Sequence, residues 1–479
     1  VVTETGDGGV DITRFDGKSL ISDLRFSVGQ GDEVIEMGAG SYRIASGDST
    51  FATLKLANRQ GENIAVWDLV DDANVKLGAV TISGRTTSSL SILVEGTQGN
   101  RVRFDAACTG DDRFVGGGEH AMDVDHAGEA FALWVGEPGI GKTTSDVPPS
   151  DWILTGTKHA TSYPDPFFIR PEPVGVMTLT DARVEVDLCT GSRWRFDIWD
   201  NNATFYVLDA DKPIDLVREH ALMFGVPAMP PDWAFGVWAD AVRGVERVMS
   251  VATDLREAGV PATVIWSEDW RGGEQSAIGY HPRPEWEVDE ALYPDPSGVD
   301  ADLEAMGFKW LAYFQPFLVV GSTAYEEASQ YALKNSDGEP YLFLGPSLGD
   351  TAVLDLTNPA GYDWALQKFI ACADVGFDGW MADYGEWVPQ DAVAANMDAE
   401  TEHNSYAVQW QALSSESLQN RDATYFARSG WIGSPTLAPV HWPGDQRTSF
   451  DVDDGLPTVV AMTLGGSIAG IAPVRLGCT

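Results

Sequence analysis

Gly376-Phe-Asp-Gly-Trp-Met-Ala-Asp-Tyr-Gly-Glu-Trp-Val-Pro389 is the stretch of this chain that decides its fold. The largely apolar run Phe377 to Ala382 predicts a buried β-strand. Asp383 stands at the C-terminal end of that strand, and Glu386 follows three residues later. Parallel barrels carry their chemistry at this end of their strands. The segment therefore indicates a barrel strand that delivers two carboxylates to one site.

A second segment, Val440-His-Trp-Pro-Gly-Asp-Gln446, repeats the pattern about sixty residues further on. An apolar run and aromatic residues again lead to an acid, Asp445. Glycoside cleavage needs two carboxylates, one as nucleophile and one as proton donor, and apolar ring faces on which a sugar can stack. Asp383 and Asp445, flanked by Trp387 and Trp442, therefore predict a glycoside hydrolase.

The composition excludes several other classes of function. The 479 residues include 31 basic and 72 acidic ones, which gives a formal net charge of −41. Long-range repulsion would oppose binding to nucleic acid or to an anionic membrane, whereas a neutral sugar is indifferent to this field. No run of eighteen apolar residues occurs, so we expect no transmembrane helix. The length is sufficient for two or more domains.

The four cysteines are scattered, without the paired spacing of a metal site: Cys108, Cys189, Cys372 and Cys478. We expect buried free thiols, with one disulfide as the alternative, and neither a metal nor a cofactor. The chain starts without an initiator Met or a signal peptide, which suggests a trimmed or partial sequence. Compartment and oligomeric state stay open.

The organisation of the chain changes near residue 228. Before it, short alternating segments such as Ser91–Glu95 and Trp194–Ile198 are separated by Gly, Asp, Asn and Ser, a rhythm typical of a β-sandwich. Met229-Pro-Pro231 marks the predicted boundary. We therefore predict an N-terminal β-sandwich over residues 1–228 and a second domain over residues 229–479.

Strands and helices alternate in the second domain. Apolar residues at helical spacing between Val245 and Leu255 predict a helix that ends at Gly259. The predicted strands are Phe235–Ala239, Ala262–Ser267, Trp310–Phe314, Gly379–Ala382, Tyr425–Ala427 and Ala438–Trp442, with Ser467–Ala472 as a seventh. Such alternation indicates a parallel sheet closed as a (β/α)8 barrel. The predicted fold is an α/β protein in which an all-β domain precedes that barrel.

One motif points to a nucleotide and is rejected. Gly136-Glu-Pro-Gly-Ile-Gly-Lys-Thr143 fits the phosphate-loop pattern, but that mechanism needs a helix directly after the Lys. Two prolines, in Ser145-Asp-Val-Pro-Pro-Ser150, follow instead, and the segment lies within the all-β region. We predict no nucleotide site here.

Several segments resemble glycoside hydrolase family 31, a family of retaining α-glycosidases. Coverage runs from about residue 113 nearly to the C-terminus. The matching segments, in the order of the family, are Pro231-Asp-Trp-Ala-Phe-Gly-Val-Trp238, Val264-Ile-Trp-Ser-Glu-Asp-Trp270, Asp355-Leu-Thr-Asn-Pro359, the Asp383 segment, Ala427-Arg-Ser-Gly430 and Trp442-Pro-Gly-Asp-Gln446. Phe131-Ala-Leu-Trp and Glu137-Pro-Gly-Ile-Gly-Lys142 resemble a loop of its sulfoquinovosidase-like branch, which explains the false phosphate loop. The resemblance implies a galactose-mutarotase-like sandwich before the barrel.

The resemblance also assigns roles to residues. It implies that Asp383 is the nucleophile and Asp445 the general acid/base of a double displacement. Asp269 matches a carboxylate that accepts hydrogen bonds from sugar hydroxyls, and Arg428 an arginine near the same subsite. The further candidate substrate-binding residues are Glu268, Glu386 and the walls Trp270, Trp442 and Phe450. Core packing is the alternative for the aromatic residues, and a role in orienting its neighbours is the alternative for Glu386.

Departures from the family pattern bear on the substrate. In the sulfosugar branch an Arg and a Trp after the second strand hold the sulfonate, and ungapped counting from Asp269 places His281 and Pro284 there. Glu268 fits one variant of that branch. We therefore expect an α-glucosidase, with sulfoquinovosidase, α-galactosidase or an inactive carbohydrate-binding fragment as alternatives. The polar pair His403-Asn404, in a long insertion, could shape the pocket or simply belong to a loop.

The last residues give a further expectation. Gly465-Gly-Ser-Ile-Ala-Gly-Ile-Ala472 resembles the start of the family's seventh barrel strand, and only Pro473 to Thr479 follow. The barrel would then be truncated near strand 7, leaving unpaired edges and apolar faces. On this basis residues 1–479 alone are expected to be poorly soluble or inactive.

Overall fold

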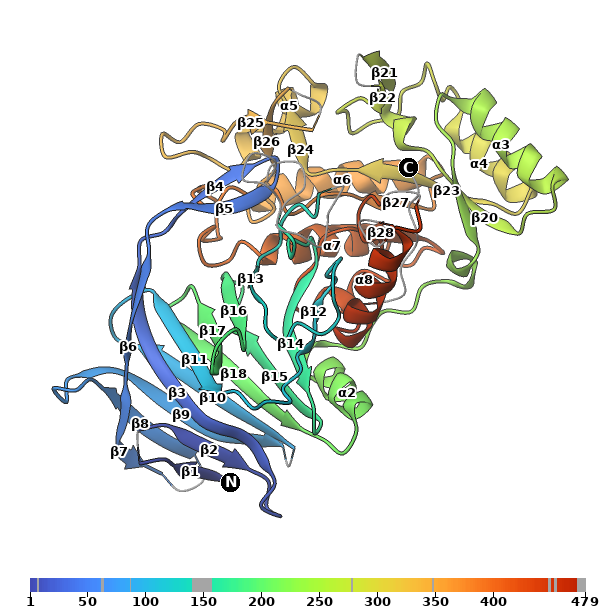
Figure 1. Cartoon of the computed structure of the whole chain (residues 1–479). Coiled ribbons are helices and arrows are strands. Elements are labelled where there is room, and N and C mark those ends of the chain that lie inside the picture. The colour runs from blue at the N-terminus through green and yellow to red at the C-terminus, as the bar shows by residue number, and fades with distance from the viewer. Residues whose placement is uncertain are drawn as a thin grey trace.

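The computed structural model describes residues 1–6, 8–61, 64–86, 88–139, 157–276, 279–346, 349–446, 449–451 and 455–471. A strand-rich N-terminal part and a mixed α/β part lie against each other (Figure 1). The predicted fold class, a sandwich followed by a barrel-type domain, is confirmed. The division between residues 228 and 229 stays a prediction. Ile140 to Thr143 of the phosphate-loop motif, and the prolines after them, lie outside the described residues.

The N-terminal part consists of two antiparallel sheets. The first runs in the order β1 (Val2–Glu4), β2 (Val10–Thr13), β3 (Ser19–Gly31), β11 (Arg101–Ala107), β17 (Arg193–Ile198), β16 (Val184–Leu188) and β13 (Ala130–Leu133), with β6 (Ser49–Thr53) also paired to β3. The second runs in the order β12 (Val115–Gly118), β14 (Pro164–Arg170), β15 (Val174–Leu179), β18 (Asn202–Asp209), β10 (Ser89–Gly96), β9 (Lys76–Thr86), β8 (Ile64–Val70) and β7 (Lys55–Gln60).

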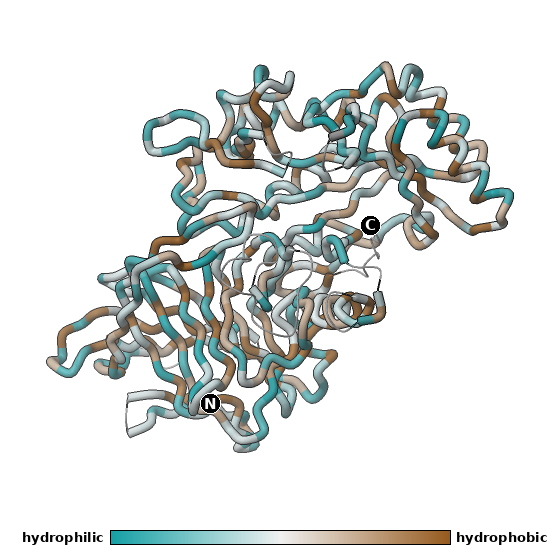
Figure 2. Tube along the Cα trace, turned by 45° about the horizontal axis from the view of Figure 1, so that its top comes forward, coloured by the Kyte–Doolittle hydropathy of each residue, from teal (hydrophilic) through white to brown (hydrophobic). Residues whose placement is uncertain are grey.

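Alternation of side chains produces the core between the two sheets. Along β11, Val102, Phe104 and Ala106 are fully buried, because successive side chains of a strand point to opposite faces. Phe104 lies opposite Phe196 of β17, and both belong to one hydrophobic cluster. The same alternation of apolar and polar residues is visible along the tube of Figure 2. The predicted alternation of apolar and polar residues therefore corresponds to side chains that point alternately into the core and away from it.

A disulfide links Cys108, directly after β11, to Cys189, directly after β16. The expectation of free thiols was wrong for this pair, because strands separated by 81 residues in sequence bring the two Cα atoms to 6.0 Å. Both sulfurs are used, so neither remains as a thiolate ligand for a metal. Cys372 is a buried free thiol, as predicted. Cys478 lies outside the described residues.

The C-terminal part contains a parallel sheet whose spatial order equals its chain order. Among the described residues it comprises β19 (Val237–Asp240), β20 (Ala262–Trp266), β23 (Lys309–Phe314), β27 (Gly379–Ala382), β28 (Thr424–Ala427) and β29 (Val440–His441). The helices between them are α3 (Val245–Glu257), α4 (Pro296–Ala305), α5 (Thr323–Ala328), α6 (Pro359–Asp374) and α7 (Ser405–Ser417), and α2 (Pro213–Phe224) precedes the sheet. Successive β-α-β units of this kind are typical of a barrel. None of the described helices is both long and apolar enough to cross a membrane.

The predicted seventh strand was wrong where the structure describes it. Ser467 and Ile468 end helix α8 (Leu456–Ile468), and a turn follows. Gly465 lets this helix approach β12. A Cβ on Gly465 would lie 2.4 Å from the carbonyl oxygen of Gly118. Close helix–strand packing therefore accounts for a glycine at this position.

Two features of the sandwich reach the barrel. The hairpin β4 (Val34–Gly38) and β5 (Ser41–Ser46) extends from the sandwich to the other part (Figure 1), where the Tyr42 hydroxyl donates to the carbonyl oxygen of Glu386 at 2.6 Å. Val135, after β13, donates its N–H to Asn404 Oδ1 at 2.8 Å, and its carbonyl oxygen bonds His403 Nε2 at 2.8 Å. The pair His403-Asn404 is thus buried between the two parts.

We expect Gly465→Ala to destabilise the protein, although alanine favours a helix more than glycine does. The new methyl group meets backbone, which cannot rotate away, so overpacking should lower the free energy of unfolding by about 1–3 kcal/mol. Calorimetric melting measures this. Gly110→Ala, on an exposed turn with no atom within 4 Å of the added Cβ, is the control and should leave the melting temperature unchanged. Equal melting of both variants would contradict the packing of α8 on β12.

Candidate active site

The carboxyl ends of the parallel strands meet at one edge of the sheet. Asp383 follows β27, Arg428 follows β28, Asp445 lies in the loop after β29, and Glu268 follows β20. Both Asp383 and Asp445 lie close enough to Glu268 to raise the pKa of its carboxyl group. The structure therefore gathers these four predicted site residues, from separate segments of the sequence.

Asp383 is nearly enclosed, and its two oxygens have different partners. The Tyr313 hydroxyl donates to Oδ2 at 2.5 Å, and the N–H of Tyr384 donates to Oδ1 at 2.8 Å. Arg428 Nε lies 3.4 Å from Oδ1. Burial raises the pKa of Asp383, whereas Arg428 and the Tyr313 hydroxyl lower it. These donors favour the ionised form that a nucleophile needs.

Arg428 is shared with two further carboxylates. Its Nη2 contacts Glu386, which is fully buried, and lies 2.9 Å from Glu137 Oε2. Burial raises the pKa of Glu386 to about 8 despite the opposing charge of Arg428. One guanidinium cannot neutralise three buried anions, so at neutral pH Glu386 carries a proton. Its place beside Arg428 agrees with the predicted orienting role.

Glu268 is a second carboxyl group that stays protonated at neutral pH. Burial raises its pKa to about 8, and Asp240, Asp383 and Asp445 add to the rise, while Arg271 opposes it. Asp240, the last residue of β19, has its pKa raised to about 6 by burial and by Asp269. A neutral Glu268 beside two carboxylates can donate a hydrogen bond that an ionised one cannot.

Asp269 is fully buried, and protein donors occupy its oxygens. The N–H of Arg243 donates to Oδ2 at 2.6 Å, the Tyr280 hydroxyl to Oδ2 at 2.5 Å and the Tyr293 hydroxyl to Oδ1 at 2.5 Å. Tyr280 belongs to the hairpin β21 (Gly273–Ser276) and β22 (Gly279–Pro282). In this structure Asp269 fastens that hairpin to the barrel, and its role as an acceptor for sugar hydroxyls stays a prediction.

The three predicted aromatic walls have different positions. Trp270 lies in the core, where its indole N–H donates to the Tyr313 carbonyl oxygen at 2.8 Å and its ring contacts Phe314. Phe450 is 87% exposed. The position of Trp270 agrees with the alternative of core packing, and the roles of both residues as walls for a substrate stay predictions. Trp442 is buried, with the Arg428 guanidinium 5.8 Å from its ring centre, and so belongs to the site.

Sequence analysis missed Tyr313, Glu137 and Arg271 as site residues. Tyr313 is hard to recognise in the sequence because it belongs to an apolar strand. Its position next to the C-terminal end of that strand could have indicated a site residue. Arg271 is fully buried, with no hydrogen-bond partner for Nε and Nη2, and its guanidinium lies 4.8 Å from the centre of the Tyr313 ring. Its only signal was a charged residue at the end of the short helical turn Glu268–Arg271, which follows the second barrel strand.

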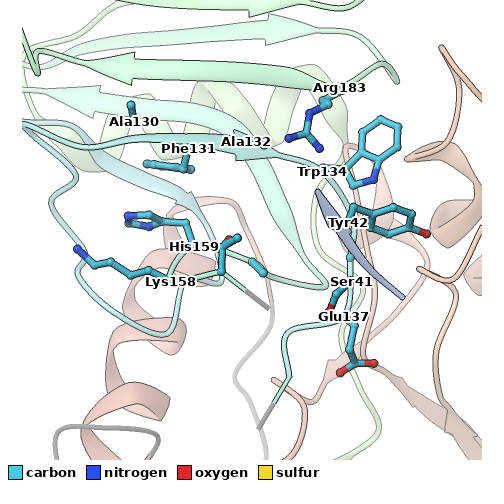
Figure 3. Close-up of a pocket in the computed structure, with 13 residues that line it drawn as sticks. Ser41, Tyr42, Ala130, Phe131, Ala132, Trp134, Glu137, Lys158, His159 and Arg183 are labelled. Atoms are coloured by element: carbon cyan, nitrogen blue, oxygen red, sulfur yellow. The ribbon is translucent and has the colours of Figure 1, made fainter. Parts of the chain in front are cut away.

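A cavity of about 220 Å³ lies on the sandwich side of Glu137 (Figure 3). Its aromatic walls are already stacked, Phe131 on His159 at 4.2 Å and Trp134 on His403 at 4.0 Å between ring centres. Its cations are paired as well, since Lys158 bonds Glu129 and Arg183 bonds Glu185. Phe131, Trp134, Lys158 and Arg183 thus all have protein partners, and we assign the cavity no ligand.

Comparison with known families identifies the barrel. Residues 227–474 match the model described as the glycosyl hydrolases family 31 TIM-barrel domain. The chain belongs to glycosyl hydrolase family 31. The predicted resemblance to this family of glycosidases is thereby confirmed, and so is the expectation of a glycosidase at the level of the family.

Individual relatives extend the similarity into the sandwich. The chain is 28% identical over 461 residues to the sulfoquinovosidase of Agrobacterium fabrum, covering 93% of this chain and 68% of the relative, and 28% identical over 389 residues to that of Escherichia coli K12, covering 78% and 56%. The solved structure of a family 31 sulfoquinovosidase from E. rectale, in complex with an aza-sugar inhibitor, superimposes with a TM-score of 0.89 at 25% identity. That match covers 99% of this chain and 73% of the other. The chain thus spans between about half and three quarters of these relatives.

We expect Asp269→Asn to lower the free energy of unfolding by about 2 kcal/mol or more, because the amide nitrogen cannot accept from its donors. Thermal unfolding measures the loss. Phe450→Ala, which removes an exposed ring, is the matched control and should melt like the unchanged protein. If Asp269 were instead a sugar ligand, Asp269→Asn would keep its stability and only weaken substrate binding.

Proposed function

We propose that this chain is a retaining α-glycoside hydrolase that cleaves α-sulfoquinovosides, with Asp383 as nucleophile and Asp445 as general acid/base. The observation that carries the proposal is the environment of Asp383, held by Tyr313 and Arg428 and electrostatically coupled, through Glu268, to Asp445. Family membership supports the reaction type.

The reaction proceeds in two displacements. Asp383 attacks the anomeric carbon while Asp445 gives its proton to the departing glycosidic oxygen, so that a glycosyl ester forms and the aglycone leaves as an alcohol. Asp445, now a carboxylate, then removes a proton from water, which attacks the same carbon and releases Asp383. Two inversions give net retention. Tyr313 and Arg428 stabilise the departing Asp383 carboxylate in the second step.

The substrate class rests on both relatives and residues. Two matched relatives and the superimposed structure are named sulfoquinovosidases, which favours this alternative over the α-glucosidase that the sequence suggested. A sulfonate needs hydrogen-bond donors and positive charge. Arg271 offers two unpartnered guanidinium nitrogens beside Tyr313, which itself bonds the nucleophile. We propose that Arg271 supplies positive charge for the sulfonate in place of the arginine that His281 replaces.

A neutral α-hexopyranoside is the second candidate. His281 pairs with Glu274 at 3.2 Å, and Arg283 pairs with Asp289 at 3.4 Å, so these two side chains of the hairpin region already have acidic partners. That pairing, and the absence of Trp at position 284, favour a neutral substrate. Comparing a sulfonated and a neutral substrate therefore decides between the candidates.

The arrangement of Asp383, Tyr313 and Arg428 leads us to expect activity in place of the inactivity that the C-terminal residues suggested. The chain should hydrolyse 4-nitrophenyl α-sulfoquinovoside with the α-anomer as the first product, as proton NMR would detect. Asp383→Asn should lose turnover by several orders of magnitude, because the amide cannot form the ester intermediate. Asp445→Ala should recover turnover of this activated substrate when azide is added, since a small anion replaces the missing base.

Phe450→Ala serves as the control for these variants and should retain full activity. A β-anomer as first product would exclude the double displacement. Full activity of Asp383→Asn would remove Asp383 from the mechanism, and a lack of azide rescue would count against Asp445.

We expect Arg271→Gln to reduce kcat/KM for 4-nitrophenyl α-sulfoquinovoside about 10- to 100-fold more than for 4-nitrophenyl α-glucoside. A hydrogen bond to a charged group contributes about 1.5–3 kcal/mol, and only the sulfonate loses one. Arg283→Gln removes an exposed, paired arginine from the same segment and should leave the ratio unchanged. Equal losses on both substrates would show that Arg271 does not recognise the sulfonate.

A further inference from the structure

Glu137 brings a carboxylate of the sandwich to the edge of the barrel. It follows β13 and Val135, and its backbone N–H donates to the Gly40 carbonyl oxygen at 2.8 Å, in the turn between β4 and β5. Its Oε1 accepts from the N–H of Gly139 at 3.1 Å. The side chain is 15% exposed. Glu137 is therefore held at its backbone and at one oxygen, which leaves Oε2 for other partners.

Both partners of Oε2 come from the barrel. Arg428 Nη2 lies at 2.9 Å, and the indole N–H of Trp387 donates at 3.1 Å. Trp387 adjoins Glu386 in the loop after β27, and Arg428 follows β28. One oxygen of the sandwich thus fixes the loops that follow two neighbouring barrel strands.

The same contact affects the charge that Asp383 experiences. The positive charge of Arg428 acts on Asp383 through Nε at 3.4 Å, while Glu386 and Glu137 both contact Nη2. Glu137 raises the pKa of Asp383 and that of Glu386, opposite in direction to Arg428. Without Glu137, the guanidinium would lose an anchor and its charge would act on the nucleophile with less compensation.

We propose that Glu137 is a positioning residue for the nucleophile, fixing the Arg428 guanidinium and limiting how strongly its positive charge acts on Asp383. The inference rests on the proposed glycosidase function and deepens it, because it makes the sandwich a part of the catalytic environment. Excess positive charge at Asp383 would stabilise the resting carboxylate and slow its attack on the anomeric carbon.

Other contacts hold the two parts together independently of Glu137. Tyr42 bonds the loop after β27, and His403 and Asn404 bond Val135. Glu137→Gln therefore removes one charge while the docking of sandwich and barrel persists, and the amide oxygen can still accept from Trp387.

The groups that affect the titration of Asp383 come from every neighbouring element. They are Tyr313 of β23, Tyr384 and Glu386 after β27, Arg428 after β28, Glu268 and Arg271 after β20, and Glu137 of the sandwich. Asp445 after β29 acts on Glu268. Glu137→Gln changes only one of these directly. The low-pH limb of kcat/KM reports the ionisation of the nucleophile in the free enzyme.

The test compares that limb in two variants with opposite expected shifts. Glu137→Gln removes a negative charge, so the pKa of Asp383 falls, and the limb should move to lower pH by about one unit, with about tenfold lower kcat. Tyr313→Phe removes a donor to the ionised form, so the pKa rises, and the limb should move to higher pH by about one unit.

Two further variants complete the experiment. Glu36→Gln removes an exposed acid on β4 and should match the unchanged protein in limb and in kcat. Glu137→Asp keeps the charge, so its limb should stay nearer that of the unchanged protein than the limb of Glu137→Gln does.

The outcomes separate this inference from the proposed function. An unmoved limb in Glu137→Gln beside a shifted limb in Tyr313→Phe would overturn the role of Glu137 and leave the glycosidase proposal intact. Identical limbs in Glu137→Asp and Glu137→Gln would also overturn it. An unchanged protein without glycosidase activity, or an active Asp383→Asn, would instead defeat the proposed function itself.

Discussion

The buried Arg428 guanidinium is the interaction on which the rest of the site depends. It lies within reach of Asp383 and Glu386, both in the segment after β27, and of Glu137 of the sandwich. Burying a charge is costly unless it is paired, so the cation and its acids require one another. Removing Arg428 would leave Asp383 and Glu137 without their shared cation. The same side chain therefore links the sandwich to the barrel and affects the ionisation of Asp383.

A second constraint is the crowding of acids in a chain that is strongly acidic overall. Burial raises the pKa of both Glu268 and Glu386 to about 8, which favours their neutral forms. Burial also raises the pKa of Asp383, but there Arg428 and the Tyr313 hydroxyl oppose the rise. Neutralisation by protonation keeps the repulsion in the site small without further cations. It also supplies donors of the kind that sugar hydroxyls accept. Asp383 differs from Glu268 because the Tyr313 hydroxyl and the N–H of Tyr384 donate hydrogen bonds to its carboxylate.

Much of the barrel could be predicted from sequence because its signals are local. Gly379–Ala382 is a short buried strand followed by an acid, and parallel strands bring such ends to one edge. Contacts that depend on tertiary structure could not be predicted. No residue near Glu137 in the sequence indicates that it contacts Arg428. Trp270 is of a residue type that often stacks on sugars, but its ring lies in the core. The strand predicted over Ser467–Ala472 was wrong where the structure describes it, because Ser467 and Ile468 belong to helix α8. Gly465 allows that helix to approach β12.

The bond between Tyr42 and Glu386 joins positions 344 residues apart, and it has a consequence for the order in which the molecule is made. During synthesis the hairpin β4–β5 emerges long before the loop it will hold. Domains generally fold as they leave the ribosome, N-terminal part first. The sandwich can then fold first, and the loop after β27 packs against it later. The segment that carries Asp383 and Glu386 therefore packs against a hairpin that was synthesised before it.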